Sequence, residues 1–310
     1  MNIGHKEILE GIDGIFKRGN YYYSDYILNQ LKKQETLILL QDIIAKSGKT
    51  PSEAIIVFLA AIRYIGKDLD ALRKLEQNDS FSDFVNNHYH EINHISINKK
   101  VQGNIPERGF PILEIIGKKL RGNSVGVIEL GASYGLIGSC LLNPTFILEN
   151  KNEFIKLGYK LPENPKKICC YLGIEIDPPD KDWLLACFSN YDDTIRVNSY
   201  IESIHYNSNF QLIKASAINF SKLKEVNKFL KMNIKPIILT SFMLYQFNYE
   251  HQKRLSEEIF EFTKKFNGHW IRQEVGFKNE IDGLEYFIEW NGKKIMNLHD
   301  DKCSNWEWIK

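Results

Sequence analysis

The sequence predicts an α/β protein in which a mostly parallel sheet, ending in an antiparallel hairpin, follows an all-helical N-terminal domain. Three observations predict this fold class. Apolar residues recur at three- and four-residue spacing before residue 124, without strand-like alternation. Short apolar strands then alternate with helical stretches, which is typical of parallel strands joined by crossover helices. Near the C-terminus, Asn291-Gly292 separates two alternating stretches, and this dipeptide is a strong hairpin signal.

The first third of the chain reads as a succession of helices. The stretches K-E-I-L-E-G-I-D-G-I-F, Y-I-L-N-Q-L-K-K-Q and S-E-A-I-I-V-F-L-A-A-I-R-Y-I all carry helical spacing. Pro51, followed by Ser52 and Glu53, is a suitable start for the third of them. D-L-D-A-L-R-K-L and S-F-S-D-F-V-N-N-H-Y-H-E-I suggest two more. Tyr21 to Tyr23 are expected to pack in a core or at a domain interface.

After Asn123 the chain predicts five strands and then the hairpin. The strands are V-G-V-I-E-L, I-C-C-Y-L-G-I-E-I-D, F-Q-L-I-K-A-S-A, K-P-I-I-L-T-S-F and G-H-W-I-R-Q-E-V-G-F, and the hairpin joins L-E-Y-F-I-E-W to K-K-I-M-N-L. The polar segment N-K-K-V-Q-G-N-I-P-E-R-G-F marks a boundary between a helical domain, residues 1–105, and an α/β domain, residues 106–310. Residues 143–168 read as an insertion, and Trp306 and Trp308 are expected on the sheet edge.

Composition argues against several classes of protein. The formal net charge of +1 gives no global attraction to nucleic acid or to an anionic membrane. The five cysteines are odd in number and include no C-x-x-C, so neither a disulfide framework nor a zinc knuckle is expected, and a reduced, cytoplasmic setting fits best. His90 and His94 are one helical turn apart but lack a third ligand at a convincing spacing, so no metal site is expected. There is no signal-peptide-like start, and the most apolar helix is too short to span a bilayer. Neither a membrane nor a nucleic-acid partner is therefore expected.

The turn E-L-G-A-S-Y-G is the candidate ligand site. A strand that runs through a glycine turn into a helix exposes backbone N–H groups, and glycine can adopt positive φ there and let a ligand approach closely. Glycines also let a helix pack close to a strand, so both interpretations stay open. Ser133, where dinucleotide motifs often carry glycine, argues against a pyrophosphate, and its side chain is expected to cap the following helix. The predicted ligand contacts in this turn are Glu129, Gly131, Ala132, Ser133 and Gly135.

A doubly wound sheet with a terminal hairpin resembles the Rossmann-like fold of class I methyltransferases, whose cofactor, S-adenosylmethionine, carries no phosphate. Glu129 then suits the α-ammonium of that cofactor. Glu175 at the end of the second strand can accept both ribose hydroxyls, and Asp177 is better suited to a turn or a cap. Ser216 stands where an acid often reads the adenine amino group, and Ser241 is expected at the mouth of the pocket.

Several segments, in order, also resemble a mainly bacterial family, the domain of unknown function 2332. They are K-K-V-Q-G-N-I-P-E-R, I-E-L-G-A-S-Y-G-L-I, G-I-E-I-D-P-P-D-K-D-W-L-L-A-C-F-S, I-I-L-T-S-F-M-L-Y-Q and C-S-N-W-E-W-I, within about residues 15–310. The resemblance implies a methyltransferase-like domain behind a helical domain, with an insertion after the glycine turn, and implies no known activity. The chain departs from the family at Ile105, Ile137 and Thr240, where the family has Glu, Asn and His.

The segment before the first strand gains a possible role from these resemblances. In many methyltransferases it folds over the methionine end of the cofactor, so Gln102, Asn104 and Arg108 are expected to form a lid. Arg108 would meet the cofactor carboxylate as a bidentate pair. The alternative interpretation is a polar linker with a surface arginine.

The expected function is S-adenosylmethionine-dependent, in-line methyl transfer to a nitrogen or oxygen nucleophile, driven mainly by positioning. Tyr245 and Glu274 are the candidate catalytic bases. Two alternatives stay open. One is a non-catalytic module that binds an adenosyl ligand or a partner. The other is an NAD(P)-dependent oxidoreductase, which the hairpin and Ser133 disfavour.

Overall fold

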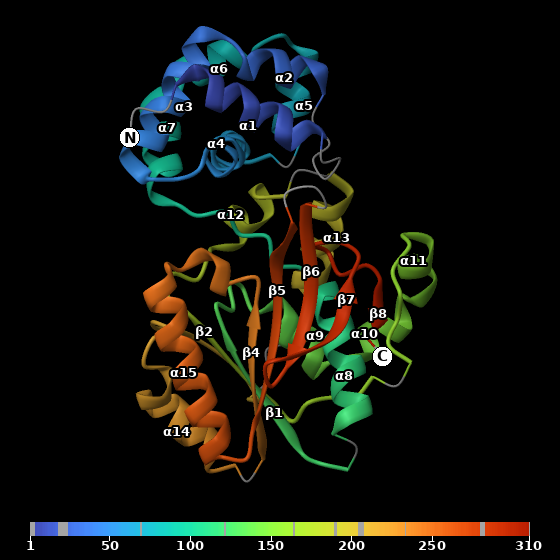
Figure 1. The fold of residues 1–310 in the computed structure, drawn as a ribbon. Coiled ribbons are helices and arrows are strands. Elements are labelled where there is room, and N and C mark those ends of the chain that lie inside the picture. The colour runs from blue at the N-terminus through green and yellow to red at the C-terminus, as the bar shows by residue number, and fades with distance from the viewer. Residues whose placement is uncertain are drawn as a thin grey trace. The chain divides into compact units, whose positions relative to one another are not determined.

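The chain divides into two compact units in the computed structural model. One unit contains Met1–Gly103 and Pro179–Ser203, and the other contains Asn104–Pro178 and Ile204–Lys310 (Figure 1). The structure describes residues 4–17, 24–68, 70–120, 122–163, 165–188, 191–203, 208–232, 234–279 and 283–309. The cluster expected at Tyr21 to Tyr23 lies outside these residues.

The first unit is helical throughout its described elements. Its helices are α1 (His5–Lys17), α2 (Asp25–Leu31), α3 (Gln34–Ser47), α4 (Pro51–Gly66), α5 (Ala71–Gln77), α6 (Phe81–Asn87), α7 (Tyr89–Asn98), α12 (Lys181–Ala186) and α13 (Tyr191–Ser203). The predicted start of α4 at Pro51 is confirmed. Thr50 and Glu53 form a reciprocal capping box around it, which satisfies two of the N–H groups that a helix start leaves without partners.

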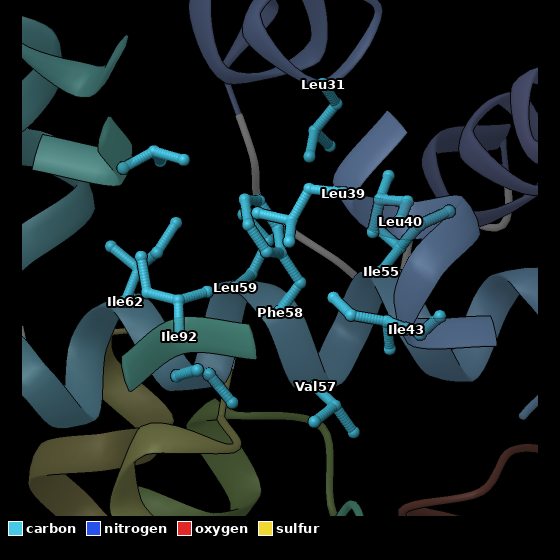
Figure 2. Packing of buried hydrophobic residues seen from close by; sticks show 14 of the residues in the cluster. Leu31, Leu39, Leu40, Ile43, Ile55, Val57, Phe58, Leu59, Ile62 and Ile92 are labelled. Carbon is cyan, nitrogen blue, oxygen red and sulfur yellow. The ribbon is translucent and has the colours of Figure 1, made fainter. Parts of the chain in front are cut away.

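Helix α4 is the centre of the helical unit. Its buried positions lie all around the helix, as expected for a helix enclosed by others. Figure 2 shows Phe58 and Leu59 of α4 among side chains of α2, α3 and α7, including Leu31, Leu40 and Ile92. The core of this unit is therefore built from one apolar helix and the apolar stripes of its neighbours.

Residues 179–203 belong to the helical unit, although the sequence analysis places them in the α/β domain. The physical reason lies in α12. Trp183 lies in α12 and Cys187 directly follows it. Both side chains are buried in the same apolar cluster as the helices of residues 1–103. The Trp183 indole N–H also donates to the backbone oxygen of Lys100 at 2.9 Å. The division into residues 1–105 and 106–310 is corrected accordingly.

The second unit is built on an eight-stranded sheet with the order β3-β2-β1-β4-β5-β6-β7-β8. The first five strands in this order run parallel, and β6, β7 and β8 continue as an antiparallel meander. The strands are β1 (Val125–Leu130), β2 (Cys170–Glu175), β3 (Phe210–Lys214), β4 (Lys235–Ser241), β5 (His269–Asn279), β6 (Gly283–Trp290), β7 (Lys293–Leu298) and β8 (Trp306–Trp308).

This sheet confirms the predicted mixed α/β class. The hairpin forms at Asn291-Gly292, where both residues have positive φ as a tight two-residue turn requires. The edge strand β8 contains Trp306 and Trp308, and Trp306 is buried. Because β1 and β4 are neighbours while the chain leaves β1 toward β2, the order reverses between β1 and β4. Ligands of open α/β sheets bind at the carboxyl ends of strands at such a point.

Helices cover both faces of the sheet. On one face α14 (Lys224–Leu230) and α15 (Tyr249–Lys265) pack on alternate residues of β1, β2 and β4 (Figure 1). On the other face lie α8 (Phe110–Lys119) and α9 (Leu136–Leu142). The remaining elements are α10 (Thr145–Glu149) and α11 (Lys151–Lys156) in the predicted insertion, and the short helices η1 (Pro106–Gly109), η2 (Phe220–Lys222) and η3 (Leu244–Gln246). Among the described helices, none has the length and apolar character needed to cross a membrane.

Candidate functional site

The turn after β1 has the backbone that its sequence predicts. Gly131 and Gly135 adopt positive φ, at 73° and 79°, and Ser133 does the same at 52°. A left-handed conformation costs a non-glycine residue about 1–2 kcal/mol. The backbone N–H of Ser133 compensates by donating to the Glu175 carboxylate at 2.9 Å. The expected helix cap is wrong, because the Ser133 hydroxyl is buried with no hydrogen-bond partner among the described residues and α9 begins after Gly135.

Side chains, rather than open space, face the two glycines of the turn. A Cβ added at Gly131 would lie 2.6 Å from the sulfur of Met243, and one added at Gly135 would lie 2.7 Å from the Phe210 ring. Met243 follows β4, and Phe210 begins β3. The glycines therefore serve close packing in this structure, which was one of the two interpretations of the turn.

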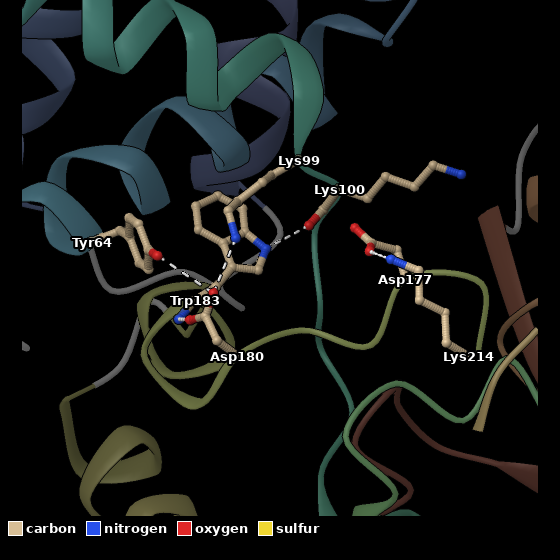
Figure 3. Close-up of polar contacts among 7 residues, drawn as sticks. All are labelled: Tyr64, Lys99, Lys100, Asp177, Asp180, Trp183 and Lys214. Carbon is tan, nitrogen blue, oxygen red and sulfur yellow. Dashed lines mark hydrogen bonds and ion pairs between the residues drawn. The ribbon is translucent and has the colours of Figure 1, made fainter. Parts of the chain in front are cut away.

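Glu175 lies at the end of β2, but its carboxylate is occupied by backbone groups. It accepts N–H bonds from Ser133 and Ile176, each at 2.9 Å, and a longer one from Asp177 at 3.4 Å. Asp177 is exposed and pairs with Lys214 at 2.9 Å (Figure 3). Both acids therefore hold the ends of β1, β2 and β3 in register.

Glu129 is one of the buried acids of this unit. It is fully buried near the end of β1, and burial raises the pKa of its carboxyl to about 8, with the nearby Glu175 adding to the rise. The Tyr171 hydroxyl donates to its Oε2 at 2.6 Å. Its Oε1 has no hydrogen-bond partner among the described residues. A buried carboxyl with one unsatisfied oxygen is costly unless a ligand completes it.

Tyr171 is a site residue that the sequence analysis missed. It lies on β2, and burial together with the adjacent Glu129 raises the pKa of its hydroxyl well above the ordinary value. Two glycines make room for it. A Cβ at Gly138 would lie 2.1 Å from the Tyr171 ring, and one at Gly173 would lie 2.8 Å from its hydroxyl. A glycine inside the second strand, two residues after a tyrosine, was the available signal.

Asn104 and Arg108 surround the same acid. The Asn104 amide donates to the backbone oxygen of Ala132 at 3.3 Å, and its Oδ1 has no partner among the described residues. Asn104 and the positive charge of Arg108 both lower the pKa of Glu129, although burial dominates. Gln102, the third lid residue, belongs to the helical unit, where its backbone N–H donates to the thiol of Cys187.

Arg108 is held at three points. Its Nε donates to the backbone oxygen of Asp301 at 2.8 Å, and its guanidinium carbon lies 4.4 Å from the centre of the Phe242 ring. Its backbone oxygen accepts a bond from the Gln273 amide at 3.2 Å. That amide also donates to the Cys303 thiol at 3.0 Å. Gln273 was not predicted, and its buried place in an apolar strand was the available signal.

The remaining predicted residues lie at the end of β4, on β5 and after β3. The Ser241 hydroxyl donates to the side-chain oxygen of Gln273 at 2.7 Å. Glu274 is buried, and one of its oxygens accepts the backbone N–H groups of Met243 and Leu244 at 3.0 and 2.8 Å. Burial raises the pKa of Glu274. Ser216 is exposed and its hydroxyl accepts the backbone N–H of Ile218.

The second candidate base, Tyr245, is exposed in η3. Within the described ranges, no group of three or more His, Cys, Asp or Glu side chains gathers closely enough to hold a metal ion. What the arrangement does offer is a set of acceptors, on Glu129 and Asn104, close to the positive charge of Arg108. Such a set suits a zwitterion better than a simple anion or cation.

Comparisons with known proteins give no family. No model of a known protein family matches the chain, and no curated protein matches it. Similarity to solved structures is at a low level, as two examples show. One is the structure of SCL7 from Oryza sativa, with a TM-score of 0.32 and 12% identity over 80% of this chain, and the chain spans only 54% of its length. The other is a putative class I S-adenosylmethionine-dependent methyltransferase from Listeria monocytogenes, with a TM-score of 0.29 and 10% identity over 78% of this chain and 76% of its own.

Proposed function

We propose that the α/β unit binds S-adenosylmethionine at the carboxyl ends of β1 and β4 and transfers its methyl group to a nitrogen or oxygen nucleophile. The observation that supports it is the buried Glu129, near Asn104 and the charge of Arg108; one oxygen of Glu129 and the amide oxygen of Asn104 have no hydrogen-bond partner among the described residues. An α-amino-acid group needs acceptors for its ammonium and a fork of donors for its carboxylate, and these residues supply both. The bound cofactor would supply an electrophilic methyl group.

The residues fit the amino-acid end of the cofactor better than its adenosine. Glu175 already accepts three backbone N–H groups, and a carboxylate offers about four acceptor sites. One site is too few for a ribose diol. Met243 also fills the space next to Gly131. Adenosine binding would therefore require Met243 to turn away and Glu175 to release a backbone group.

A non-catalytic binding module is the second candidate, and the state of Glu274 favours it. The Glu274 Oε1 serves two backbone N–H groups and its Oε2 is buried with no hydrogen-bond partner among the described residues, so neither oxygen is exposed to take a proton from a substrate. Methyl transfer by positioning alone needs no strong base, so both candidates share the same binding site. Membership of the domain of unknown function 2332 is part of this proposal, and rests on the segments quoted above. An NAD(P)-dependent oxidoreductase stays disfavoured by the C-terminal hairpin and by Ser133.

Calorimetric titration of the full chain tests the binding step. The ligands are S-adenosylmethionine, S-adenosylhomocysteine, 5′-methylthioadenosine, which lacks the amino-acid group, and NAD. We expect the first two to bind and the third to bind at least about tenfold more weakly, because it loses the charged hydrogen bonds. Glu129→Gln should weaken the binding of S-adenosylmethionine by a similar factor. Glu257→Gln, on the exposed surface of α15, should leave this affinity unchanged.

The outcomes separate the candidates. Equal binding of 5′-methylthioadenosine and S-adenosylmethionine, or no binding of either, would overturn the assignment of Glu129 to the ammonium. Formation of S-adenosylhomocysteine in a protein-free metabolite extract, abolished by Glu129→Gln, would support the transferase. Tight binding without any such product would support the binding module.

A further inference from the structure

The helical unit contains a buried cation for which the described residues supply no anionic partner. Arg63 lies on α4 and is only 5% exposed. Its Nη1 donates to the backbone oxygen of Phe188. Its Nε and Nη2 are buried and have no hydrogen-bond partner among the described residues. These two nitrogens form one edge of the guanidinium, so the free groups are a pair of parallel donors rather than two scattered ones.

The groups near Arg63 do not neutralise it. The charge of Arg63 reaches the thiol of Cys187, but burial raises the pKa of that thiol to about 12, so it stays protonated. Asp180, whose negative charge adds to the raised pKa of Cys187, is paired with other groups. Its carboxylate pairs with Lys99 at 3.2 Å and accepts the backbone N–H of Trp183 at 2.6 Å. Within the described part of the chain, no acid accepts a hydrogen bond from the Nε or Nη2 of Arg63.

Lys99 is a second cation of the helical unit, and its charge is balanced by neighbouring side chains. Its ammonium lies 5.0 Å from the centre of the Tyr64 ring and 5.1 Å from that of Trp183, in addition to its pair with Asp180 (Figure 3). Tyr64 follows Arg63 directly in the sequence. The charge of Lys99 is thus balanced by an acid and two aromatic rings. Arg63 is more deeply buried, and among the described residues its guanidinium donates to one carbonyl.

A buried guanidinium without an anion is expensive, and arginine is retained at such positions where two oxygens are to be held in one plane. We propose that Arg63 is an anion-binding residue of the helical unit, which takes a carboxylate or a phosphate group of a ligand on its Nε–Nη2 edge as a bidentate pair. The Phe188 carbonyl stays on Nη1 and orients the fork. Because the edge is enclosed, salt screens this pair less than a surface pair.

Thermal unfolding of the full chain tests this proposal, using inorganic phosphate and acetate as probes against chloride at equal ionic strength. We expect phosphate or acetate to raise the Tm of the wild type by an amount that grows with the logarithm of its concentration. Phosphate also stabilises proteins by exclusion from their surface, so the relevant quantity is the increment above that of Arg63→Met. Arg63→Lys keeps the charge without the fork and should lose most of the increment. Whichever of phosphate and acetate gives the larger increment in Tm indicates whether the ligand offers a phosphate or a carboxylate group.

Two results support the proposal only if they occur together. In chloride alone, Arg63→Met should raise the Tm by about 2 °C or more, since it removes an unpaired buried charge and keeps the length of the side chain. The anion-dependent increment should disappear in the same variant. The control Arg73→Met, at an exposed residue of α5, should change neither value. An equal increment in wild type and Arg63→Met, or a lower Tm of Arg63→Met in chloride, would overturn the proposal.

Discussion

The raised pKa of Glu129 predicts how the stability of this protein depends on pH. We consider the substitution Glu129→Gln, which keeps the shape of the side chain and an oxygen that can accept from the Tyr171 hydroxyl. The folded wild type binds a proton at Glu129 with a pKa of about 8, against 4.5 ordinarily. Its contribution to the free energy of unfolding is therefore fully present below pH 4.5 and is lost as the pH rises through 8.

The magnitude follows from the distance between the two pKa values. Each pH unit between them changes the free energy of unfolding by at most about 1.4 kcal/mol. At pH 7 the wild type should have lost about 3 kcal/mol relative to its stability near pH 4.5, an upper bound because buried sites relax. Glutamine does not titrate, so the stability of the variant has no such pH dependence from this position. The difference between Glu129→Gln and wild type should therefore be small near pH 5 and should grow toward pH 8 in favour of the variant.

Urea unfolding followed by circular dichroism at a series of pH values measures this difference. Glu257→Gln, at an exposed site on α15, is the matched control and should run parallel to the wild type. Curves for Glu129→Gln and wild type that are parallel over the whole range would refute the reasoning. They would show that Glu129 is already ionised, or is equally protonated in the unfolded chain.

The same titration predicts the pH dependence of ligand binding. An ammonium group binds the ionised form of Glu129, which is the minor form below pH 8. The affinity for S-adenosylmethionine should therefore rise about tenfold per pH unit as the pH approaches 8 from below. Binding by Glu129→Gln should be weak and should show no such slope. Binding that persists but does not depend on pH would place the ammonium elsewhere.

Three further predictions concern packing and positioning. Gly131→Ala should lower the free energy of unfolding by about 1–3 kcal/mol more than Gly122→Ala, because both positions have positive φ but only Gly131 has a side chain against it; equal losses in urea unfolding would contradict this. Gln273→Met should weaken S-adenosylmethionine in the calorimeter and leave 5′-methylthioadenosine unchanged, because it frees Arg108; parallel losses would mean a general structural role. Trp183→Ala should cost about 3–5 kcal/mol in urea unfolding, since it empties a core position, and a loss below about 1 kcal/mol would contradict its place there.

Local patterns predicted the elements of this fold, and spatial relations between distant segments escaped them. The five parallel strands, the turn at Asn291-Gly292 and the start of α4 each depend on a few neighbouring residues, so a single sequence suffices. The assignment of residues 179–203 does not. An apolar helix face such as that of Trp183 has the same sequence pattern whichever core it packs into. The pattern therefore does not indicate to which of the two units the helix belongs.

The candidate site shows the same limit more sharply. The spacing E-x-G-x-x-x-G identified the turn and correctly indicated positive φ at both glycines. It could not decide between a ligand and packing, because that depends on Met243, which lies more than a hundred residues away in the chain and next to Gly131 in space.

Ser133 illustrates why a non-glycine residue is accepted in such a turn. Its value lies in a backbone N–H rather than in its hydroxyl, because the left-handed conformation aims that N–H at Glu175 on the adjacent strand. The conformation that strains the serine thus orders the acid, and the ordered acid holds the end of β2 against the end of β1. The feature that the sequence analysis attributed to the ligand therefore acts first on the strand ends, and the ligand hypothesis rests on Glu129 instead.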